Sequence, residues 1–323
     1  MLNTGTRPFV PAHRWARRGR HLDNTSILAL TERPDHLVIV GGSYIGLEMG
    51  QIFRRLGSAV TVVEQSAAVA SREDPEFSAM IREALEAEGV DIRVSTAVQR
   101  VRPGPGGRTE IHLDDGTMLE ASHLLLAVGR VPNTDRMGLD TIGIELTPRG
   151  QVVTNDRLET NVPGVWALGD INGRGAFTHT SYHDHEIVLA NWGGGSRGTD
   201  QRIPTYAMFT DPPLGHVGIH EYEARTLVDE GRRISMATLP MSAVSRAREE
   251  SETIGSIKLL VDDDSGKFLG ATMLGIGADE LVQVIGQLMA AGATWHSVRE
   301  ALPIHPTVTE FLPTILDLRQ PLG

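Results

Sequence analysis

The sequence predicts an α/β protein in which a parallel sheet with packed helices precedes an α+β domain with an antiparallel sheet. In residues 34–129, short apolar runs bounded by glycine alternate with segments of helical periodicity. Near the C-terminus, two alternating strands flank an acidic, glycine-containing turn. The 323 residues and their 40% hydrophobic content suit two folded domains and a smaller remnant better than a disordered chain.

Charge and composition narrow the class of function. The formal net charge of −11 argues against binding to nucleic acid or anionic membranes, since both need a concentrated positive surface. No run reaches the roughly 18 apolar residues that span a bilayer, so a cytoplasmic location is expected. The lack of cysteine excludes disulfides and thiolate chemistry within the chain. A basic cluster near the start is interpreted as a solvated loop and comprises Arg14, Arg17, Arg18 and Arg20.

A strand-helix-strand unit is predicted first. Residues 37–40 form an apolar run between a Pro-Asp pair and a Gly-Gly pair, as a buried parallel strand does. A helix follows, ended by Gly57, and residues 59–63 form the next strand. The apolar face of that helix comprises Ile45, Met49, Ile52, Phe53 and Leu56.

The same region continues with a second helix and more strands. That helix opens with Asp74 as N-cap and Pro75 in its first turn, and it ends near Gly89 before a strand over residues 90–94. Two alternating strands between residues 109 and 120 flank the turn Asp114-Asp115-Gly116, and residues 124–127 form another buried strand.

The C-terminal domain is predicted to follow a glycine-rich connector at residues 193–196. Residues 130–192 are less periodic. Strands over residues 256–261 and 268–274, joined through a turn at 262–266, and a helix over 278–291 predict an antiparallel sheet with a packed helix.

A dinucleotide-binding fingerprint lies between the first strand and the first helix. It comprises Gly41, Gly42, Ser43, Tyr44, Ile45 and Gly46. Gly41 permits the tight turn, Gly46 permits close packing of helix on strand, and the helix N-terminus offers N–H groups to a pyrophosphate. Ser43 replaces the usual middle glycine. Glu64, at the end of the second strand, would accept a hydrogen bond from a ribose hydroxyl and repel a 2′-phosphate, so NAD(H) is favoured over NADP(H).

Several further stretches resemble the class I pyridine nucleotide-disulfide oxidoreductases, in the order which that family has them. The group includes mercuric reductase, lipoamide dehydrogenase and glutathione reductase. The matching stretches are residues 3–8 (NTGTRP), 127–134 (AVGRVPNT), 166–170 (WALGD), 177–179 (FTH), 209–212 (FTDP) and 304–310 (IHPTVTE). The resemblance covers essentially the whole chain.

The resemblance implies two cofactors, FAD and NAD(H). Asp170 resembles the aspartate that holds a ribitol hydroxyl of the flavin. Tyr44 resembles the gate over the flavin that a nicotinamide ring displaces, and Glu48 resembles the partner of a redox-helix lysine that this chain lacks. The other residues placed near the cofactor by the resemblance are Gly129, Arg130, Phe177, Thr178 and His179.

The resemblance also implies an acid/base pair. His305, oriented by Glu310, resembles the histidine that one subunit of a homodimer presents to the active site of the other. An imidazole held by a carboxylate suits proton transfer near neutral pH. The alternative is that this pair caps a helix and fills an interface.

The implied architecture is a Rossmann-type NAD domain inserted in a truncated FAD domain, followed by the α+β dimerisation domain. Its expected parts are an FAD-domain remnant (1–33), the NAD(P)-binding domain (34–129), the C-terminal segment of the FAD domain (130–200) and the dimerisation domain (201–323). Family members begin with a further FAD-binding segment that carries the redox cysteines, and the sequence here begins inside that domain. We therefore expect impaired flavin chemistry in this chain.

The expected reaction of the complete protein runs from NADH to FAD and on to a disulfide, metal-ion or small-molecule acceptor. The alternative is a catalytically inactive NADH-binding and dimerising fragment, or one half of a split flavoenzyme. No metal site is predicted. The histidines His179, His183 and His185 are interpreted as polar surface, and the acidic turn at 262–266 as a hairpin, since Met273 stands where a calcium loop needs glutamate.

Overall fold

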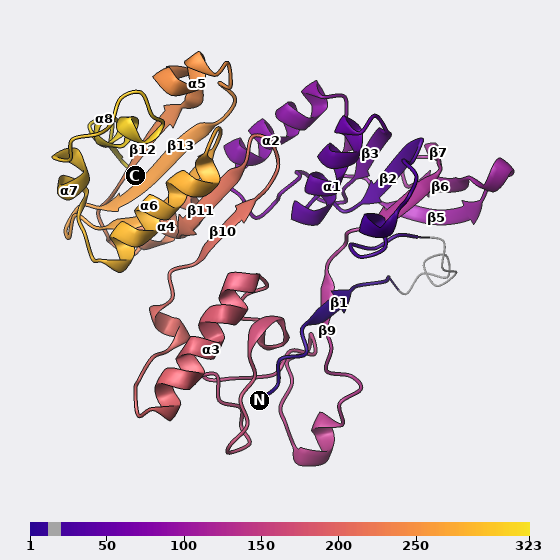
Figure 1. The fold of residues 1–323 in the computed structure, drawn as a ribbon, viewed down its shortest axis with the longest axis horizontal. Helices are drawn as coiled ribbons and strands as arrows, with labels where there is room; N and C mark the ends of the chain where they lie inside the picture. Colours follow the sequence, from indigo (N-terminus) through magenta and orange to yellow (C-terminus); the bar gives the residue numbers. More distant parts are fainter. Residues whose placement is uncertain (12–20) are drawn as a thin grey trace. The chain divides into compact units, whose positions relative to one another are not determined.

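The computed structural model describes residues 1–11 and 21–323, which form two compact units (Figure 1). The smaller unit joins Met1–Pro11 to Val128–Arg202, and the larger joins residues 21–127 to Ile203–Gly323. The predicted basic cluster at Arg14 to Arg20 lies outside the described residues. Among the helices that the structure describes, none is long and apolar enough to cross a bilayer.

The first half of the larger unit is built on a parallel sheet with strand order β4-β3-β2-β8. Its strands and helices are β2 (His36–Val40), α1 (Tyr44–Arg55), β3 (Ala59–Val63), α2 (Pro75–Ala87), β4 (Asp91–Arg93) and β8 (His123–Leu126). Each was predicted from the sequence to within a few residues. The core forms because Leu37, Ile39 and Val62 of the strands and Leu47 of α1 are fully buried.

A three-stranded antiparallel sheet follows, with order β5-β6-β7. Its strands are β5 (Val98–Pro103), β6 (Thr109–Leu113) and β7 (Met118–Ala121). The turn around Gly116, which has a positive φ of 85°, confirms the predicted hairpin. We did not predict β5, because its residues are partly or fully exposed and its apolar side chains are interrupted by Arg100 and Arg102.

The second half of the larger unit contains a six-stranded sheet with order β10-β11-β14-β13-β12-β15, antiparallel throughout. Its strands are β10 (Thr205–Met208), β11 (Leu214–Gly218), β12 (Ile234–Pro240), β13 (Ser256–Asp262), β14 (Phe268–Leu274) and β15 (Gln320–Pro321). The predicted antiparallel pairing of β13 with β14 is confirmed. The acidic turn between them is a hairpin, in which the carboxylate of Asp262 accepts hydrogen bonds from Ser265.

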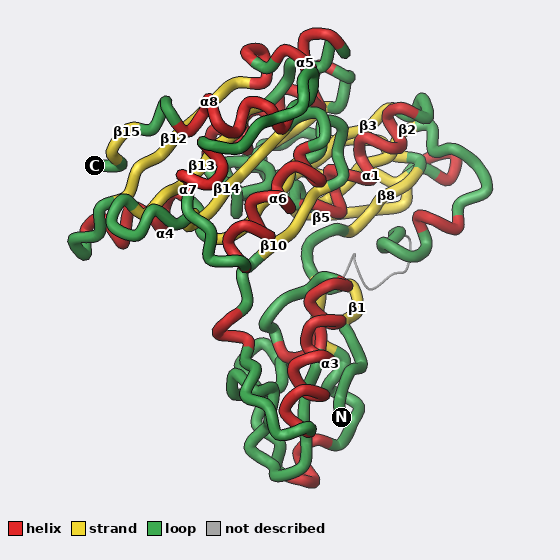
Figure 2. The backbone as a smooth tube through the Cα atoms, turned by 60° about the vertical axis from the view of Figure 1, so that its left-hand side comes forward, coloured by secondary structure: helices red, strands yellow, loops and turns green. Residues whose placement is uncertain are grey.

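Helices cover this sheet and extend beyond it. They are α4 (Glu221–Asp229), α5 (Ser245–Glu249), α6 (Ala278–Ala290), α7 (Trp295–Arg299) and α8 (Leu312–Leu316). Figure 2 shows α6 lying across the strands, and its predicted span is confirmed. The helix approaches β11 closely, since a Cβ added at Gly215 would lie 2.6 Å from Val282 Cγ1.

The smaller unit contains little regular structure. Its strands and helix are β1 (Thr6–Pro8), β9 (Arg130–Pro132) and α3 (Thr178–Trp192), and β1 pairs with β9 in antiparallel fashion. We did not predict α3, whose N-terminal half is polar and which buries Asp184 beside Ile187 and Val188. In the larger unit, Leu22 bridges Leu125 and Ile27 lies in the parallel-sheet core, so the segment just before β2 packs with that sheet.

Candidate active site

The glycine loop between β2 and α1 has the backbone geometry of a phosphate-binding turn. Gly41 has a positive φ of 111°, which a residue with a side chain rarely adopts. A Cβ added at Gly46 would lie far inside van der Waals contact with the carbonyl oxygen of Gly41. A Cβ at Gly42 would lie 3.0 Å from both Glu64 Cβ and Val69 Cγ1. Glycine at these positions lets the loop fold tightly over the strand ends.

The amide groups of the first turn of α1 lie at this loop. Ser43 is the N-cap, and its exposed side chain makes no capping hydrogen bond. The N–H groups of the first helical turn therefore keep their capacity to bind an anion. Ile45 is half-buried on the first turn of the same helix. A serine in place of the usual middle glycine is accommodated here, because its side chain is exposed.

Glu64 lies across this loop from the helix. Its Oε2 accepts a hydrogen bond from the N–H of Gly42 at 2.7 Å, and its Oε1 accepts one from Ser66 at 2.7 Å. Each carboxylate oxygen has a second lone pair, so the side chain still offers acceptors to a hydroxyl group. A carboxylate that can accept further hydrogen bonds therefore lies beside the glycine loop, as the predicted contact with a ribose hydroxyl requires.

Tyr44, the first residue of α1, is tied to a buried hydrogen-bonded network. Its hydroxyl donates to Glu73 Oε1 at 2.5 Å, and the hydroxyl of Tyr206 lies 3.0 Å from the same oxygen. Burial, reinforced by the charge of Glu73, raises the pKa of both tyrosine hydroxyls far above the usual range. Burial also raises the pKa of Glu73. Both phenols therefore stay protonated and act as hydrogen-bond donors.

Glu48 lies one turn further along α1. Its Oε1 accepts a hydrogen bond from the backbone N–H of Phe209 at 2.8 Å, and burial raises its pKa. Gln51 donates to the carbonyl oxygen of Asp211 and accepts from its N–H. The two side chains thus bind α1 to the segment that follows β10. In the described residues Glu48 contacts a backbone amide rather than a lysine.

Asp170 lies in a glycine-dependent turn of the smaller unit. Gly169 has a positive φ of 69°, and its N–H donates to the fully buried carboxylate of Asp184. The hydroxyl of Thr6 donates to Asp170 Oδ2 at 2.8 Å, and Arg130 in turn donates to the Thr6 hydroxyl at 2.7 Å. This network fixes an acceptor carboxylate, the group that would hold a ribitol hydroxyl.

The remaining predicted flavin-side residues are also in the smaller unit. Gly129, with φ 112°, accepts a hydrogen bond from the N–H of Phe9 as the chain enters β9. Phe177 caps the N-terminus of α3, Thr178 begins it, and the rings of Phe177 and His179 stack at 5.3 Å. The structure therefore places Asp170, Gly129, Arg130 and this motif in one unit.

The histidine cluster on α3 does not form a metal-binding group in the described part of the chain. Both ring nitrogens of His183 lie about a hydrogen-bond length from arginines, 3.1 Å from Arg197 and 3.2 Å from Arg202. Burial and these cations lower the pKa of His183. A metal ion would have to displace two guanidinium groups from this side chain.

His305 and Glu310 form the predicted pair. His305 Nδ1 lies 2.8 Å from Glu310 Oε2, and the two side chains are 72% and 11% exposed. The carboxylate is held on the protein side and the imidazole points to solvent, with Nε2 available. Leu302 and Ile304, just before the histidine in the sequence, are 96% and 77% exposed, so two apolar side chains are displayed near it.

Comparison with known proteins identifies the family. A family model described as pyridine nucleotide-disulphide oxidoreductase matches residues 1–184, and the dimerisation domain of that family matches residues 204–315. The chain belongs to the pyridine nucleotide-disulfide oxidoreductase family. The class I resemblance inferred from the sequence motifs is thereby confirmed.

Three curated members of this oxidoreductase family illustrate the similarity. The chain is 34% identical to the probable pyridine nucleotide-disulfide oxidoreductase RclA of Escherichia coli K12, over 98% of this chain and 72% of that protein. It is 31% identical to dihydrolipoyl dehydrogenase of Geobacillus stearothermophilus, over 96% of this chain and 66% of that protein. It is 33% identical to mercuric reductase of Streptomyces lividans, over 94% of this chain and 66% of that protein. The chain therefore spans about two thirds of the length of these relatives.

Solved structures of the family share the fold. The HOCl-induced flavoprotein disulfide reductase RclA from Escherichia coli matches with a TM-score of 0.90 at 34% identity, over 98% of this chain and 72% of that chain. The Cu(II) complex of that protein matches with the same TM-score, over 98% of this chain and 73% of that chain. The mixed α/β architecture with a dimerisation domain is thus common to the family.

The larger unit also contains a group of buried polar residues that the sequence patterns do not indicate. Lys258 is buried and forms ion pairs with Asp74, Glu76 and Glu221. Glu73, Tyr206, His216 and His220 form the neighbouring cluster. Interacting residues of these two groups lie up to 184 positions apart in the sequence. Asp74 was interpreted only as a helix cap. The one available signal was the presence of charged residues inside otherwise apolar strands.

Proposed function

We propose that this chain carries the nucleotide-binding, flavin-contacting and acid/base parts of an NADH-dependent flavoprotein oxidoreductase. In the complete reaction, a hydride passes from NADH to FAD, and the electrons pass on to a disulfide or metal-ion acceptor. The observation that carries the proposal is the glycine cradle, in which Gly46 packs on Gly41 and Glu64 faces the loop. The family match supports the same reaction class.

Different residues of the loop would bind different parts of NADH. The amides at the start of α1 neutralise the pyrophosphate, and Glu64 accepts from the adenosine ribose. A 2′-phosphate would meet the negative charge of Glu64, so NADH is preferred over NADPH. Tyr44 lies directly after the loop, and its ring would have to move aside as the gate for a nicotinamide.

The smaller unit supplies residues that fit the flavin end of FAD. Asp170, fixed by Thr6, offers an acceptor for a ribitol hydroxyl. Gly129, Arg130, Phe177, Thr178 and His179 would line the approach to the ring system. FAD, when bound, supplies the hydride-accepting chemistry that no side chain offers.

His305 would handle the proton of the acceptor reaction. Glu310 holds Nδ1, so Nε2 faces outward to give or take a proton. Because this imidazole is exposed near two exposed apolar side chains, we propose that it acts across the interface of a homodimer. The names of the relatives suggest the acceptor class, since they include a dihydrolipoyl dehydrogenase, a mercuric reductase and a flavoprotein disulfide reductase solved with Cu(II).

A visible spectrum of the purified chain tests this proposal. The chain would be incubated with FAD, separated from free FAD by gel filtration, and then treated with NADH without oxygen. A bound flavin that NADH bleaches supports hydride transfer in this chain. A bound flavin that NADH leaves oxidised contradicts it.

The cysteine-free composition favours a second candidate function. In that alternative, the chain is an NADH-binding and dimerising module, or one half of a split flavoenzyme. A colourless protein that binds NADH supports this alternative. Recovery of flavin and NADH-dependent bleaching on addition of a separate flavin-binding chain would select the split enzyme.

A further inference from the structure

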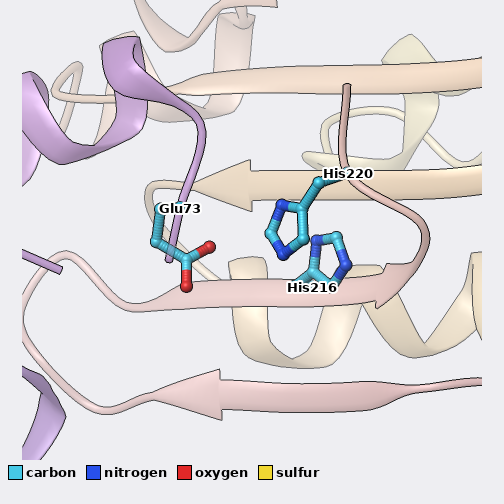
Figure 3. Close-up of side chains that lie close together, drawn as sticks. All are labelled: Glu73, His216 and His220. Carbon is cyan, nitrogen blue, oxygen red and sulfur yellow. The ribbon is translucent and has the colours of Figure 1, made fainter. Parts of the chain in front are cut away.

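Three buried side chains of metal-ligand type lie together in the larger unit (Figure 3). They are Glu73 from the segment before α2, His216 on β11 and His220 at the N-cap of α4. One oxygen or nitrogen atom of each lies within 4.8 Å of the other two, and the residues are 6%, 1% and 7% exposed. We propose that these three side chains bind a divalent transition-metal ion of the zinc type.

His216 is held in the protonation state that ligates a metal. Its Nε2 lies 3.1 Å from the carbonyl oxygen of Gly218, which can only accept, so Nε2 carries the hydrogen. Nδ1 then keeps its lone pair and accepts from the hydroxyl of Thr272 at 2.8 Å. Burial lowers the pKa of His216 to about 3, so the ring is neutral. A ligand histidine whose other nitrogen donates to a carbonyl is the usual arrangement. A metal ion on Nδ1 requires the Thr272 side chain to turn away, because its Oγ1 now occupies the position that the ion would take.

Glu73 supplies a buried carboxyl group that lacks a cationic partner among the described residues. In the part of the chain that the structure describes, no ion pair joins it to a lysine or arginine, and its carboxylate accepts hydrogen bonds from the hydroxyls of Tyr44 and Tyr206. The adjacent acidic group, Asp74 with Glu76 and Glu221, is different, because Lys258 pairs with all three. A buried charge is costly without compensation, and a bound cation would supply it.

His220 has a ring nitrogen that could act as a metal ligand. Its Nε2 lies 2.9 Å from the hydroxyl of Tyr206. Its buried Nδ1 faces the backbone N–H of Glu223 in the capping box of α4, but within the described residues it makes no hydrogen bond of normal geometry. The closest carboxylate atom to Nδ1 is Asp74 Oδ1, at 3.9 Å. Figure 3 shows the carboxylate of Glu73 facing this ring. An unpaired ring nitrogen inside a buried site is satisfied when it ligates a metal.

The two rings must change their arrangement to bind one ion. His216 and His220 stack with centroids 3.8 Å apart and planes 10° apart, so their lone pairs run side by side. Rotation of the His220 ring turns its lone pair toward the point that the Tyr206 hydroxyl now bridges, between Glu73 and His220. The resulting set of two imidazoles and one carboxylate is a typical zinc ligand set with an open fourth position.

Metal binding to the EDTA-treated full chain tests the proposal without reference to flavin chemistry. Zn²⁺ would be titrated calorimetrically, and Co²⁺ binding would be followed by visible absorption. We expect one equivalent of either ion in the wild type.

Glu73→Gln and His220→Asn should each weaken binding by at least about 10-fold, since even outer-shell changes have effects of that size. Asn keeps the N-cap of α4. His296→Asn, at an exposed histidine, is the matched control and should bind like the wild type.

A second measurement uses the wild type alone, so it stands even where a variant fails to fold. The X-ray absorption spectrum of the zinc-loaded chain should show two imidazole ligands per zinc. The proposal is overturned if the wild type binds neither ion, if both variants fold and bind like the control, or if the spectrum lacks two imidazoles. In each of those cases the cluster is a closed hydrogen-bonded network.

Discussion

Glu73 shows how burial at one residue links stability to pH. Burial raises its pKa above the ordinary value of 4.5, so the folded chain holds this proton more tightly than the unfolded chain does. Unfolding therefore releases a proton above pH 4.5, and the contribution of this residue to stability falls as the pH rises from 4.5 toward its folded pKa. The opposite slope would apply to a carboxylate with a lowered pKa.

We predict that Glu73→Gln flattens this pH dependence. The amide oxygen still accepts hydrogen bonds from Tyr44 and Tyr206, but no charge is buried at high pH. In EDTA, the variant should be at least as stable as the wild type at pH 8, and its advantage should shrink toward pH 4.5. Urea unfolding across this pH range measures the difference. A variant that is clearly less stable than the wild type at pH 8 would show that the carboxylate charge is stabilising.

The buried ion pairs of Lys258 allow a second prediction about stability. Its ammonium group is buried and lies 3.1 Å from Asp74 Oδ2, with Glu76 and Glu221 as further partners. Lys258→Met removes the cation and leaves the buried Asp74 charge uncompensated, which should cost about 3–5 kcal/mol of unfolding free energy. Lys267→Met, at an exposed lysine just before β14, should change the unfolding free energy by less than about 0.5 kcal/mol.

Urea unfolding at pH 7 gives both values. Equal stability of the two variants would mean that the acidic group around Lys258 is solvated or protonated in the folded chain. A double variant, Lys258→Met with Asp74→Asn, should recover part of the loss, because it removes one of the uncompensated charges.

At the scale of elements, α1 contains two buried glycines with opposite roles. A Cβ at Gly46 meets the carbonyl of Gly41, whereas a Cβ at Gly50 has Ile39 Cδ1 as its closest neighbour, at 3.4 Å. Gly46→Ala should therefore abolish NADH binding by forcing the loop open. Gly50→Ala should keep NADH binding and raise stability by up to about 1 kcal/mol, the helical preference of alanine over glycine.

NADH fluorescence titration and thermal unfolding of the two variants check this pair. Wild-type affinity in a folded Gly46→Ala variant would show that the loop does not hold the nucleotide. Loss of binding in Gly50→Ala would instead point to packing of α1 on β2 as the sensitive feature.

Elements with strong local signals could be predicted, and those shaped by tertiary contacts could not. The strands β2 and β3 and the helices α1 and α6 have periodic apolar faces with glycine or proline at their ends. In contrast, β5 is exposed and α3 is polar along its first half, so neither has the expected period. The glycine loop and the His305–Glu310 pair are local in sequence and were predicted. The Glu73–His216–His220 cluster joins residues more than 140 positions apart, and no local pattern marks it.

At the scale of the whole molecule, the larger unit combines the nucleotide loop with the sheet of the dimerisation domain. Glu48 and Gln51 bind α1 to the segment after β10, and Lys258 binds β13 to the start of α2. Because these contacts are buried or half-buried, the two halves should unfold together in one transition. Leu302, Ile304 and His305 therefore belong to the same unit as the glycine loop.

We predict a homodimer that depends on Leu302 and Ile304. Leu302 and Ile304 are among the most exposed large apolar side chains of the described chain, and both lie just before His305 in the sequence. Leu302→Asp combined with Ile304→Asp should convert the dimer to a monomer, because association would bury two carboxylates without partners. The control is Leu28→Asp, at a residue that is 72% exposed just before the parallel sheet.

Sedimentation velocity should show a dimer for the wild type and the control and a monomer for the double variant. NADH binding should persist in that monomer, since the glycine loop needs no residue from a second chain. A double variant that stays dimeric would place the interface on another surface, and His305 would then serve its own chain or none.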